Sequence, residues 1–266
     1  MENSGRRVTL ITGASSGIGA ELARIFAQNN HDLALVARTT ARLDQLADEI
    51  SATGRPRPLV LTCDLAKPDA ADQVLAALAS AGASVEILVN NAGFGFSGEA
   101  ATLDRGAQVA SVDVNVRALT DLTLACLPQL LAVRGKILNV ASTAAFLPGP
   151  GLAVYYATKA FVLSFSEAMT QELRGKGVQV TALCPGPTQT EFQTRAHFDP
   201  NMLLSKMSMM SARSVAQIGY DALMAGRRVV VAGMANRVLA FATRFSPHAI
   251  LLPIIAWMQG MRRDNA

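Results

Sequence analysis

Two ionisable side chains that could transfer protons together, Tyr155 and Lys159, stand four residues apart in the segment Tyr-Tyr-Ala-Thr-Lys. On a helix this spacing places a phenol and an ammonium on one face, one turn apart. A nearby cation favours the phenolate by about 1 to 3 pKa units, so the tyrosine could exchange protons near neutral pH. Ser142, on another predicted element, can donate a hydrogen bond to the same substrate oxygen. A lysine one turn after an aromatic residue is also common on helices that face solvent, so the pair needs support from other motifs.

A glycine-rich segment, Thr12 to Gly19, follows the apolar run Val8 to Ile11 and opens the helical pattern Glu21 to Gln28. Its first glycine permits a tight turn, and the later ones allow backbone to approach a pyrophosphate and a helix to approach a strand. The positive end of the helix attracts phosphate charge. No Lys-Ser/Thr follows, so the segment is not the phosphate loop of nucleotide hydrolases. It predicts a dinucleotide site, and the alternative is a tight connection without a ligand.

Length and composition favour one domain over residues 1–266, because the chain has 266 residues, 50% of them hydrophobic and 17% charged, which suffices for a large core. Three cysteines without paired spacing predict a reduced, cytoplasmic protein without a disulfide framework. Cysteines and histidines form no metal motif, so we expect no metal. Residues 1–7 are polar, so we expect no cleavable apolar leader. The net charge is only +4, and the arginines lack aromatic interleaving, which disfavours nucleic-acid binding.

Apolar runs of strand length alternate with longer segments of helical periodicity. The predicted strands are Val8–Ile11, Leu33–Val36, Leu59–Thr62, Ile87–Val89, Lys136–Val140, Val178–Leu183 and Val229–Ala232. The predicted helices after the first are Ala41–Ser51, Asp69–Ala81, Asp104–Leu131, Ala153–Gly175 and Arg213–Ala225. This alternation is typical of an α/β protein with a doubly wound parallel sheet, the Rossmann fold. Ligands of such sheets bind beyond the carboxyl ends of the strands, where the motifs lie.

The motifs in this order resemble those of the short-chain dehydrogenase/reductase family, from Val8 to about Phe192. The residues that carry the resemblance are Thr12 to Gly19, Asp64, Asn90 to Gly93, Asn115, Ser142, Tyr155, Lys159, Pro185, Gly186 and Thr190. The resemblance implies an oxidoreductase that transfers hydride between a nicotinamide cofactor and a carbonyl or alcohol substrate.

The resemblance also implies roles for four catalytic residues. Tyr155 would be the general acid in reduction and the base in oxidation, and Ser142 would hold the carbonyl oxygen. Lys159 would lower the pKa of the tyrosine and bind the nicotinamide ribose. Asn115 would bend its helix and hold a water that links the lysine to solvent. For Asn115, a polar residue that faces solvent is the alternative.

Further residues are expected to contact the cofactor by the same resemblance. Asp64 and Leu65 would flank the adenine, Asn91 and Gly93 would support the adenosine side, and the backbone at Thr188 would meet the carboxamide. A turn-forming role is the alternative for the threonine at position 190. The complete set of expected cofactor contacts is Gly13, Ser15, Ser16, Gly17, Ile18, Gly19, Arg38, Asp64, Leu65, Asn91, Gly93, Tyr155, Lys159, Pro185, Gly186, Thr188 and Thr190.

The residue at the end of the second strand favours NADP(H) over NAD(H). An NAD enzyme places an acidic residue there for the ribose 2′-hydroxyl, whereas this chain has Ala37-Arg38. An arginine binds a 2′-phosphate in forked geometry, and Asp32 at the start of the strand is out of reach. The one feature against NADP(H) is Ser16, because many NADP-using relatives carry a basic residue in the glycine turn.

Apolar residues near the expected nicotinamide site favour an apolar ketone or secondary alcohol as substrate. These are Phe94, Phe96, Phe146 to Pro148, and the segment Phe192 to Met210 within an expected lid at about 189–212. Met202, Met207, Met209 and Met210 suit an adaptable lid or an ordinary core. The segments Asn139–Ser142 and Val154–Glu172 resemble bacterial ketoreductases of broad specificity.

A C-terminal arm at about residues 234–266 is apolar, most strongly from Ala249 to Met258. Pro253 interrupts that run, which is shorter than the roughly 20 residues that span a bilayer. Two interpretations stay open. The arm packs against the body or a partner subunit, or it lies on a membrane surface with four arginines toward the headgroups, namely Arg237, Arg244, Arg262 and Arg263.

The two longest predicted helices carry more apolar residues than one buried stripe requires, which favours a two-fold interface. The family resemblance implies a homodimer or homotetramer. The residues expected at the interface are Leu119, Leu122, Leu127, Leu130, Phe161, Phe165 and Met169. The alternative is that they face the protein's own core. For the whole chain, the alternative to an enzyme is a catalytically idle dinucleotide-sensing scaffold that acts through protein contacts, which the intact catalytic set disfavours. An enoyl reductase needs a longer Tyr-Lys spacing, and a sugar epimerase a larger C-terminal part.

Overall fold

Seven apolar segments pair side by side into one parallel sheet with the strand order β3-β2-β1-β4-β5-β6-β9. The computed structural model describes residues 5–196, 209–243 and 245–258. The strands are β1 (Arg6–Thr12), β2 (Leu33–Ala37), β3 (Leu59–Thr62), β4 (Ala83–Asn90), β5 (Lys136–Val140), β6 (Gln179–Cys184) and β9 (Val229–Val231). All five residues of β2 are buried, as expected for a central parallel strand that helices cover on both faces.

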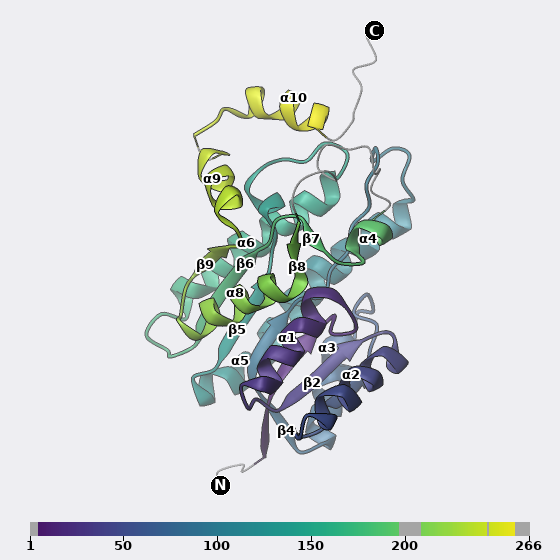
Figure 1. Ribbon diagram of the computed structural model, residues 1–266, viewed down its shortest axis with the longest axis vertical. Coiled ribbons are helices and arrows are strands. Elements are labelled where there is room, and N and C mark those ends of the chain that lie inside the picture. Colours follow the sequence, from purple (N-terminus) through teal and green to yellow (C-terminus); the bar gives the residue numbers. More distant parts are fainter. Residues whose placement is uncertain (1–4, 197–208, 244, 259–266) are drawn as a thin grey trace.

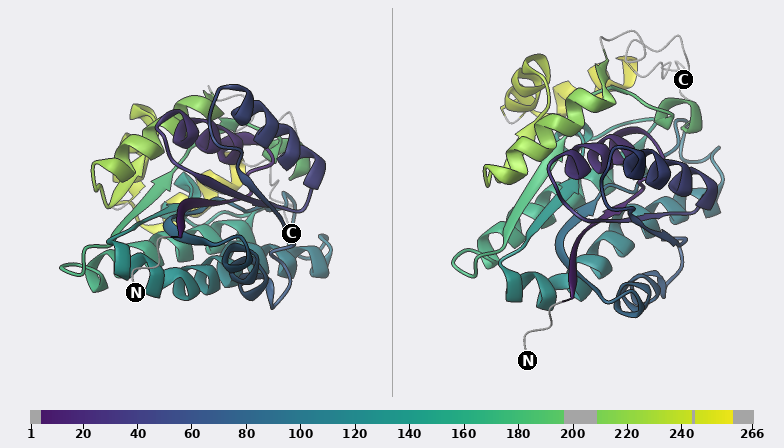
Figure 2. Two further views of the ribbon diagram at one scale, coloured as in Figure 1. Left: turned by 90° about the horizontal axis from the view of Figure 1, so that it is seen from below. Right: turned by 60° about the horizontal axis from the view of Figure 1, so that its bottom comes forward.

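Helices cover both faces of the sheet (Figures 1 and 2). One core cluster joins the sheet to α1 (Gly17–Gln28), α2 (Thr40–Ala52) and α8 (Ala212–Met224). A second cluster joins the opposite face to α3 (Ala70–Ser80), α5 (Leu119–Val133) and α6 (Ala153–Glu172). The doubly wound Rossmann fold predicted from the alternation of strands and helices is confirmed, and the described residues form a single domain.

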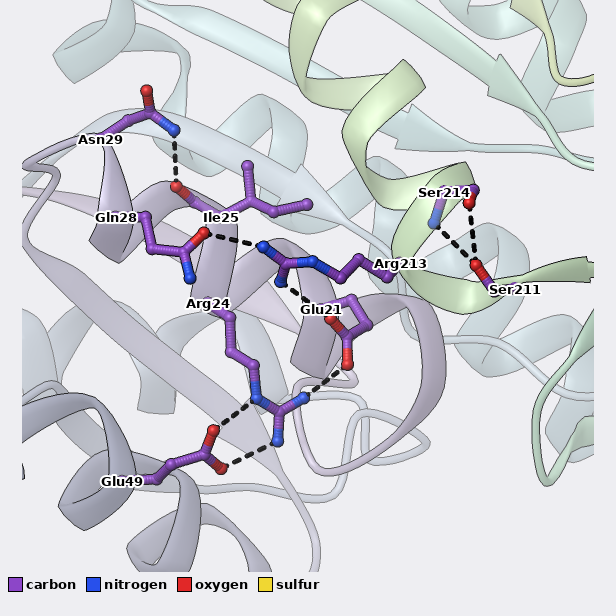
Figure 3. A network of polar contacts seen from close by, with 9 residues as sticks. All are labelled: Glu21, Arg24, Ile25, Gln28, Asn29, Glu49, Ser211, Arg213 and Ser214. Carbon is purple, nitrogen blue, oxygen red and sulfur yellow. Dashed lines mark hydrogen bonds and ion pairs between the residues drawn. The ribbon is translucent and has the colours of Figure 1, made fainter. Parts of the chain in front are cut away.

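Ion pairs between helices on the first face hold α1 in place (Figure 3). Arg24 of α1 binds Glu49 of α2 at 2.7 Å and Glu21 of its own helix at 2.8 Å. Arg213 of α8 reaches Glu21 at 3.3 Å and donates a hydrogen bond to Gln28 at 3.0 Å. The hydrogen bond from Arg24 holds the pKa of Glu49 below its usual value. The network therefore fixes the helix whose N-terminus follows the glycine turn.

The helix predicted over Asp104–Leu131 is interrupted. It comprises α4 (Arg105–Val112), the π-helical segment η1 (Asp113–Ala118) and α5. Asn115 lies within the π segment, where its amide donates to the Phe94 carbonyl at 2.9 Å and accepts from the Phe94 amide at 3.0 Å. A π turn inserts an extra residue, which reorients the side chains that follow and is frequent at functional sites. The irregularity expected at Asn115 is therefore present.

Among the described residues, the segment Arg105–Val133, which comprises α4, η1 and α5, is long and apolar enough to cross a membrane by length and composition, with a mean hydropathy of 1.4. Its middle carries Arg117, which pairs with Asp113 at 3.1 Å and donates to the Ala66 carbonyl at 2.8 Å. Its inner side buries Leu122 and Leu130 in the core. The segment is therefore a core helix of the domain.

The chain beyond β6 is less regular than predicted. It contains β7 (Thr188–Gln189), α7 (Phe192–Arg195), β8 (Met210–Ser211), α9 (Met234–Thr243) and α10 (His248–Met258). The short strands β7 and β8 pair with each other. Much of the lid expected at about 189–212, including Met202 and Met207, lies outside the described residues. The C-terminal arm is folded into two helices.

Candidate active site

A pocket of 560 Å³ lies at the carboxyl ends of the central strands. It gathers most of the residues that the sequence marked for catalysis or cofactor contact. Those on its wall are Gly13, Ser15, Ser16, Gly17, Ile18, Arg38, Asp64, Leu65, Asn91, Gly93, Ser142, Tyr155, Lys159, Pro185, Gly186, Thr188 and Thr190. Gly19 and Asn115 do not line this pocket, and both lie behind it in packing positions.

Close backbone packing shapes the glycine turn. Gly13 and Gly17 have φ of 64° and 56°, which favours glycine. A Cβ on Gly19 would lie 2.3 Å from the Gly13 carbonyl oxygen. The side-chain amide of Asn91, after β4, donates to the carbonyl of Thr12 at 2.9 Å. Gly19 therefore serves helix packing, and Asn91 supports the turn from the neighbouring strand.

The N-terminus of α1 faces the pocket through Ser15, Ser16, Gly17 and Ile18. Ser16 caps the helix in extended conformation, and its side chain makes no capping hydrogen bond. The first N–H groups of a helix have no partner within it and carry partial positive charge. The turn with its close backbone approach thus fits the pyrophosphate of a dinucleotide.

Arg38 directly follows β2, is exposed and lines the pocket. Asp32, at the opposite end of the same strand, forms an ion pair with Arg6 at 2.7 Å. The expectation that Asp32 is out of reach is confirmed. The pocket wall at the end of β2 thus presents a cation, and the carboxylate of that strand is engaged elsewhere.

The segment after β6 crosses the glycine turn. A Cβ on Gly17 would lie 3.1 Å from Cγ2 of Thr190. The Thr190 hydroxyl also accepts a hydrogen bond from the Phe192 amide at 3.3 Å, so the threonine forms a turn as well as lining the pocket. Next to it, Glu191 pairs with Arg42 of α2 at 2.8 Å. This ion pair ties the segment to the helix beside Arg38.

Tyr155 lies in the first turns of α6 and is packed tightly. A Cβ on Gly95 would lie 2.7 Å from Cδ2 of Tyr155, so residue 95 has no room for a side chain. The ring of Phe192 lies 5.1 Å from the Tyr155 ring between centroids. Ser142 follows β5 and hydrogen-bonds the phenol. The predicted pair of Ser142 and Tyr155 is brought together.

Lys159 is 5% exposed, and its Nζ donates to the Val140 carbonyl at 2.8 Å. The ammonium lies 5.9 Å from the centroid of the Tyr155 ring. A Cβ on Gly93 would lie 3.3 Å from Nζ and 3.0 Å from Oδ1 of Asn115. Glycine at position 93 therefore lets the loop after β4 approach both side chains.

Asn115 is buried and contacts the start of α6 rather than solvent, so the solvent-facing alternative is wrong. Its amide donates to the Thr158 hydroxyl at 3.0 Å, and that hydroxyl donates to the Tyr155 carbonyl at 2.7 Å. A chain of hydrogen bonds thus joins the π segment to the helix that carries the tyrosine and the lysine.

The pKa values differ from the expectation for Tyr155. Burial raises the pKa of Tyr155 to about 12, and the hydrogen bond with Ser142 offsets only part of this effect. Burial lowers the pKa of Lys159 to about 8. The pKa of Tyr155 is therefore raised and not lowered as expected, because removal of the phenol from water is the largest effect on it.

The walls near Tyr155 are largely apolar. Phe94 and Phe96 line the pocket as expected, with ring centroids 5.7 Å apart. The segment Phe146 to Pro148, expected beside the nicotinamide, instead lines a second apolar cavity of 560 Å³ together with Leu252. Met210 packs against the first core cluster. Of the two roles considered for this methionine, a lid and an ordinary core residue, the second therefore applies.

The comparison with protein families agrees with this geometry. Residues 7–200 match the family model described as short chain dehydrogenase. The chain is a short-chain dehydrogenase/reductase. It is accordingly an oxidoreductase of a family whose members bind nicotinamide dinucleotides.

This short-chain dehydrogenase/reductase is 38% identical over 188 residues to sulfoacetaldehyde reductase 2 of Chromohalobacter salexigens, covering 70% of this chain and 74% of the relative. Among solved structures, a short-chain dehydrogenase from Sphingobium yanoikuyae in complex with NADPH has a TM-score of 0.78 and 32% identity, with 98% of each chain covered. A bulky-bulky ketone specific alcohol dehydrogenase from Comamonas testosteroni has a TM-score of 0.74 and 28% identity, covering 97% and 96%. A Burkholderia phymatum enzyme in complex with NAD has a TM-score of 0.80 and 25% identity, covering 95% and 97%.

Some residues around the pocket of this short-chain dehydrogenase/reductase escaped sequence reasoning. They are Gly95, Leu152, Tyr156, Thr158 and Glu191. The alternation Gly93-Phe-Gly-Phe was a signal for Gly95, since a glycine between two aromatic residues indicates close packing. For Leu152 and Glu191 no local pattern exists, because only the tertiary arrangement brings them to the pocket.

Proposed function

We propose that this short-chain dehydrogenase/reductase is an NADP(H)-dependent ketoreductase that interconverts bulky apolar ketones and secondary alcohols. One observation carries the proposal: the phenol of Tyr155, beside Ser142 and above Lys159, faces a pocket that joins the glycine turn to apolar walls. This arrangement supplies proton transfer at one end of a dinucleotide site. The catalytic set of the proposal is Asn115, Ser142, Tyr155 and Lys159.

In the proposed mechanism the bound nicotinamide supplies or accepts the hydride. Tyr155 holds the proton at its hydroxyl and gives it to the carbonyl oxygen during reduction. Its raised pKa keeps the phenol protonated at neutral pH, so the proton is present for transfer. Ser142 donates a hydrogen bond to the same oxygen and orients it. Gly95 and Phe192 pack against the Tyr155 ring and fix its plane.

Lys159 and Asn115 would maintain the proton supply. The Lys159 ammonium is anchored on the Val140 carbonyl and faces the Tyr155 ring, where it stabilises negative charge on the phenolate after proton transfer. Asn115 positions the π segment beside Gly93 and Thr158. Its side chain bonds to protein groups, so a water linked to the lysine would rest on the backbone of the π segment.

The preference for NADP(H) rests on Arg38. The guanidinium lines the pocket at the end of β2, where the adenosine ribose lies in a Rossmann fold. An arginine can form forked hydrogen bonds with a 2′-phosphate, and the nearby Glu191 is already paired with Arg42. The Sphingobium relative with NADPH supports this preference.

The apolar ketone is supported by the walls around Tyr155, which Phe94, Phe96, Leu152 and Phe192 supply. The likeness to a bulky-bulky ketone specific enzyme over nearly the whole chain points in the same direction. A small anionic aldehyde, as in the name of the Chromohalobacter relative, would need a cation near Tyr155. Among the described wall residues, Arg38 and Lys159 are the cations, and Lys159 is engaged with Val140.

We further propose that the enzyme works in the cytoplasm as a homodimer or homotetramer. Three free, buried cysteines are compatible with a reducing compartment. The expected interface residues need correction, because Leu119, Leu122, Leu130 and Met169 are buried in the protein's own core. Of the expected residues, Phe161 is exposed, and the same helices also expose Val109, Val112, Leu124 and Leu131.

Coenzyme consumption across a panel of carbonyl compounds tests the proposal. The panel contains diaryl ketones, alkyl aryl ketones and sulfoacetaldehyde, each with NADPH and with NADH. We expect turnover of the bulky ketones with NADPH and slower turnover with NADH. Turnover of sulfoacetaldehyde alone would overturn the substrate class, and tight NADPH binding without any turnover would favour an idle dinucleotide-sensing scaffold.

A further inference from the structure

Helix α9 exposes an apolar stripe. Its inner side is small and buried at Ala240 and Thr243, where it packs on the body. The outward side chains follow one another at intervals of four, three and four residues, which places them on one helical face. They and their exposed fractions are Met234 with 70%, Val238 with 63%, Phe241 with 63% and, just beyond the helix, Phe245 with 74%. Leu239, next to Val238 in the helix, is 46% exposed and borders the stripe.

Helix α10 extends this surface. Ile255 is buried, and Leu252 lines the second apolar cavity beside α6, so one side of the helix rests on the body. Ile254 and Trp257 are 48% and 72% exposed. The helix contains no aspartate, glutamate, lysine or arginine. Both helices lie at the same end of the molecule, far from the N-terminus (Figure 1).

The arm carries an excess of positive charge. Residues 234–266 contain four arginines and one acidic residue, Asp264. One of them, Arg237 in α9, donates from Nε to the Val231 carbonyl at 3.0 Å. An apolar stripe with arginines and an exposed tryptophan is the combination that favours the interface of an anionic bilayer.

We propose that α9 and α10 dock this enzyme on an anionic phospholipid surface, with the outward stripe in the acyl-headgroup boundary and the arginines on the lipid phosphates. The charge pattern selects this partner over a second copy of the chain. A two-fold contact through the arm would bring together two segments of like net charge, each with four arginines against one aspartate in its sequence. A lipid phosphate layer supplies the missing negative charge.

Sedimentation with vesicles tests the docking, using the full chain and vesicles of phosphatidylcholine alone or mixed with phosphatidylglycerol. We expect the protein to pellet with the mixed vesicles and to stay in solution with phosphatidylcholine, with binding weakened by salt. The double variant Leu239→Ser/Phe241→Ser should lose about tenfold in vesicle affinity. Arg262→Glu/Arg263→Glu should abolish the preference for the anionic lipid.

Leu124→Ser is the matched control, because Leu124 is 52% exposed on α5 and Leu239 is 46% exposed on α9. It should bind vesicles as the unsubstituted enzyme does. Ketone reduction by every variant reports that the fold is intact. Absence of binding to mixed vesicles overturns the proposal, and so does equal binding of all variants. If the parent does not bind vesicles and the variant Leu239→Ser/Phe241→Ser forms a smaller oligomer than the parent, the partner of the arm is a second copy of the chain.

Discussion

In the core of the domain, large apolar side chains such as Leu10, Ile11 and Phe26 are fully buried, whereas in the C-terminal arm Phe241 and Phe245 expose 63% and 74% of their surface. Both regions are rich in apolar residues, so composition does not separate them. The difference lies in what covers them. Strands and helices from both halves of the chain enclose the core, and α9 and α10 touch the body on one side only.

The same contrast holds for polar groups. Behind the pocket, buried polar side chains bond one another from strand to helix: Asn90 donates to Asn139 at 2.9 Å, and Asn139 donates to Ser166 at 2.9 Å. Such networks fix one arrangement, because a buried polar group without a partner is costly. Substitutions near the pocket should therefore cost activity and stability, and substitutions in the arm should leave both unchanged.

Tyr155→Phe tests the largest expected difference. Removal of the phenol removes the proton donor, and reduction should slow by about 10²- to 10⁴-fold. The affinity for NADPH, measured by fluorescence titration, should change little. Tyr156→Phe is the adjacent control, since neighbouring helical residues point about 100° apart. Comparable losses in the two variants would show that Tyr155 is not the proton donor.

Gly19→Ala should be the most damaging change that adds only a methyl group. Its Cβ would lie 2.3 Å from the Gly13 carbonyl oxygen and 2.4 Å from the Asn91 amide. We expect a loss of about 1 to 3 kcal/mol in unfolding free energy, together with weaker coenzyme binding. Gly106→Ala in α4 is the control, because its closest neighbour would be Asp104 Oδ1 at 3.3 Å. Denaturant unfolding compares the two, and equal stabilities would contradict the tight packing of the turn.

Arg38→Asp should reverse the coenzyme preference. Loss of a charge-assisted contact with the 2′-phosphate weakens NADPH binding by about 10- to 100-fold, and the new carboxylate can accept hydrogen bonds from the ribose hydroxyls of NADH. Dissociation constants for both coenzymes measure the change. An unaltered NADPH affinity would remove Arg38 from the coenzyme site and the basis for preferring NADP(H).

The sequence predicted the pocket half of the molecule well because its determinants are local. Glycines, strand ends and the Tyr155-Lys159 spacing occur within short segments, and parallel topology brings strand ends together. It failed where tertiary contacts decide. Burial rather than Lys159 sets the direction of the Tyr155 pKa, and Leu122 and Leu130 face the core instead of a partner. The placement of Phe146 beside α10 likewise depends on the fold of the arm, which has no motif.

The pH dependence of ketone reduction probes the buried cation. The pKa of Lys159 is lowered to about 8, so the ammonium loses its proton as pH rises through this value. The phenolate then loses its stabilising charge, and kcat/KM for reduction should fall severalfold above about pH 8. Tyr155 remains protonated in this range, because its pKa is about 12. In Lys159→Arg, whose cation does not titrate, the residual activity should show no such fall. A parent profile that stays flat to pH 10 would exclude Lys159 as the titrating group.

Leu124→Asp should have the smallest effect on catalysis. It tests whether the exposed apolar residues of α5 contact a second copy of the chain, whereas those of the C-terminal arm are proposed to contact lipid. Leu124 is 52% exposed on α5, beside a face that also exposes Leu131 and lies on the opposite side of the sheet from α1. A carboxylate there is compatible with a solvated monomer, so the melting temperature should stay within about 2 °C of the parent. A two-fold interface over α5 would bury two such charges together, and the oligomer should dissociate. Light scattering measures the mass against the 28.0 kDa of one chain. If the parent is already monomeric, the α5 face has no partner copy. If the variant stays oligomeric, the interface lies on another surface.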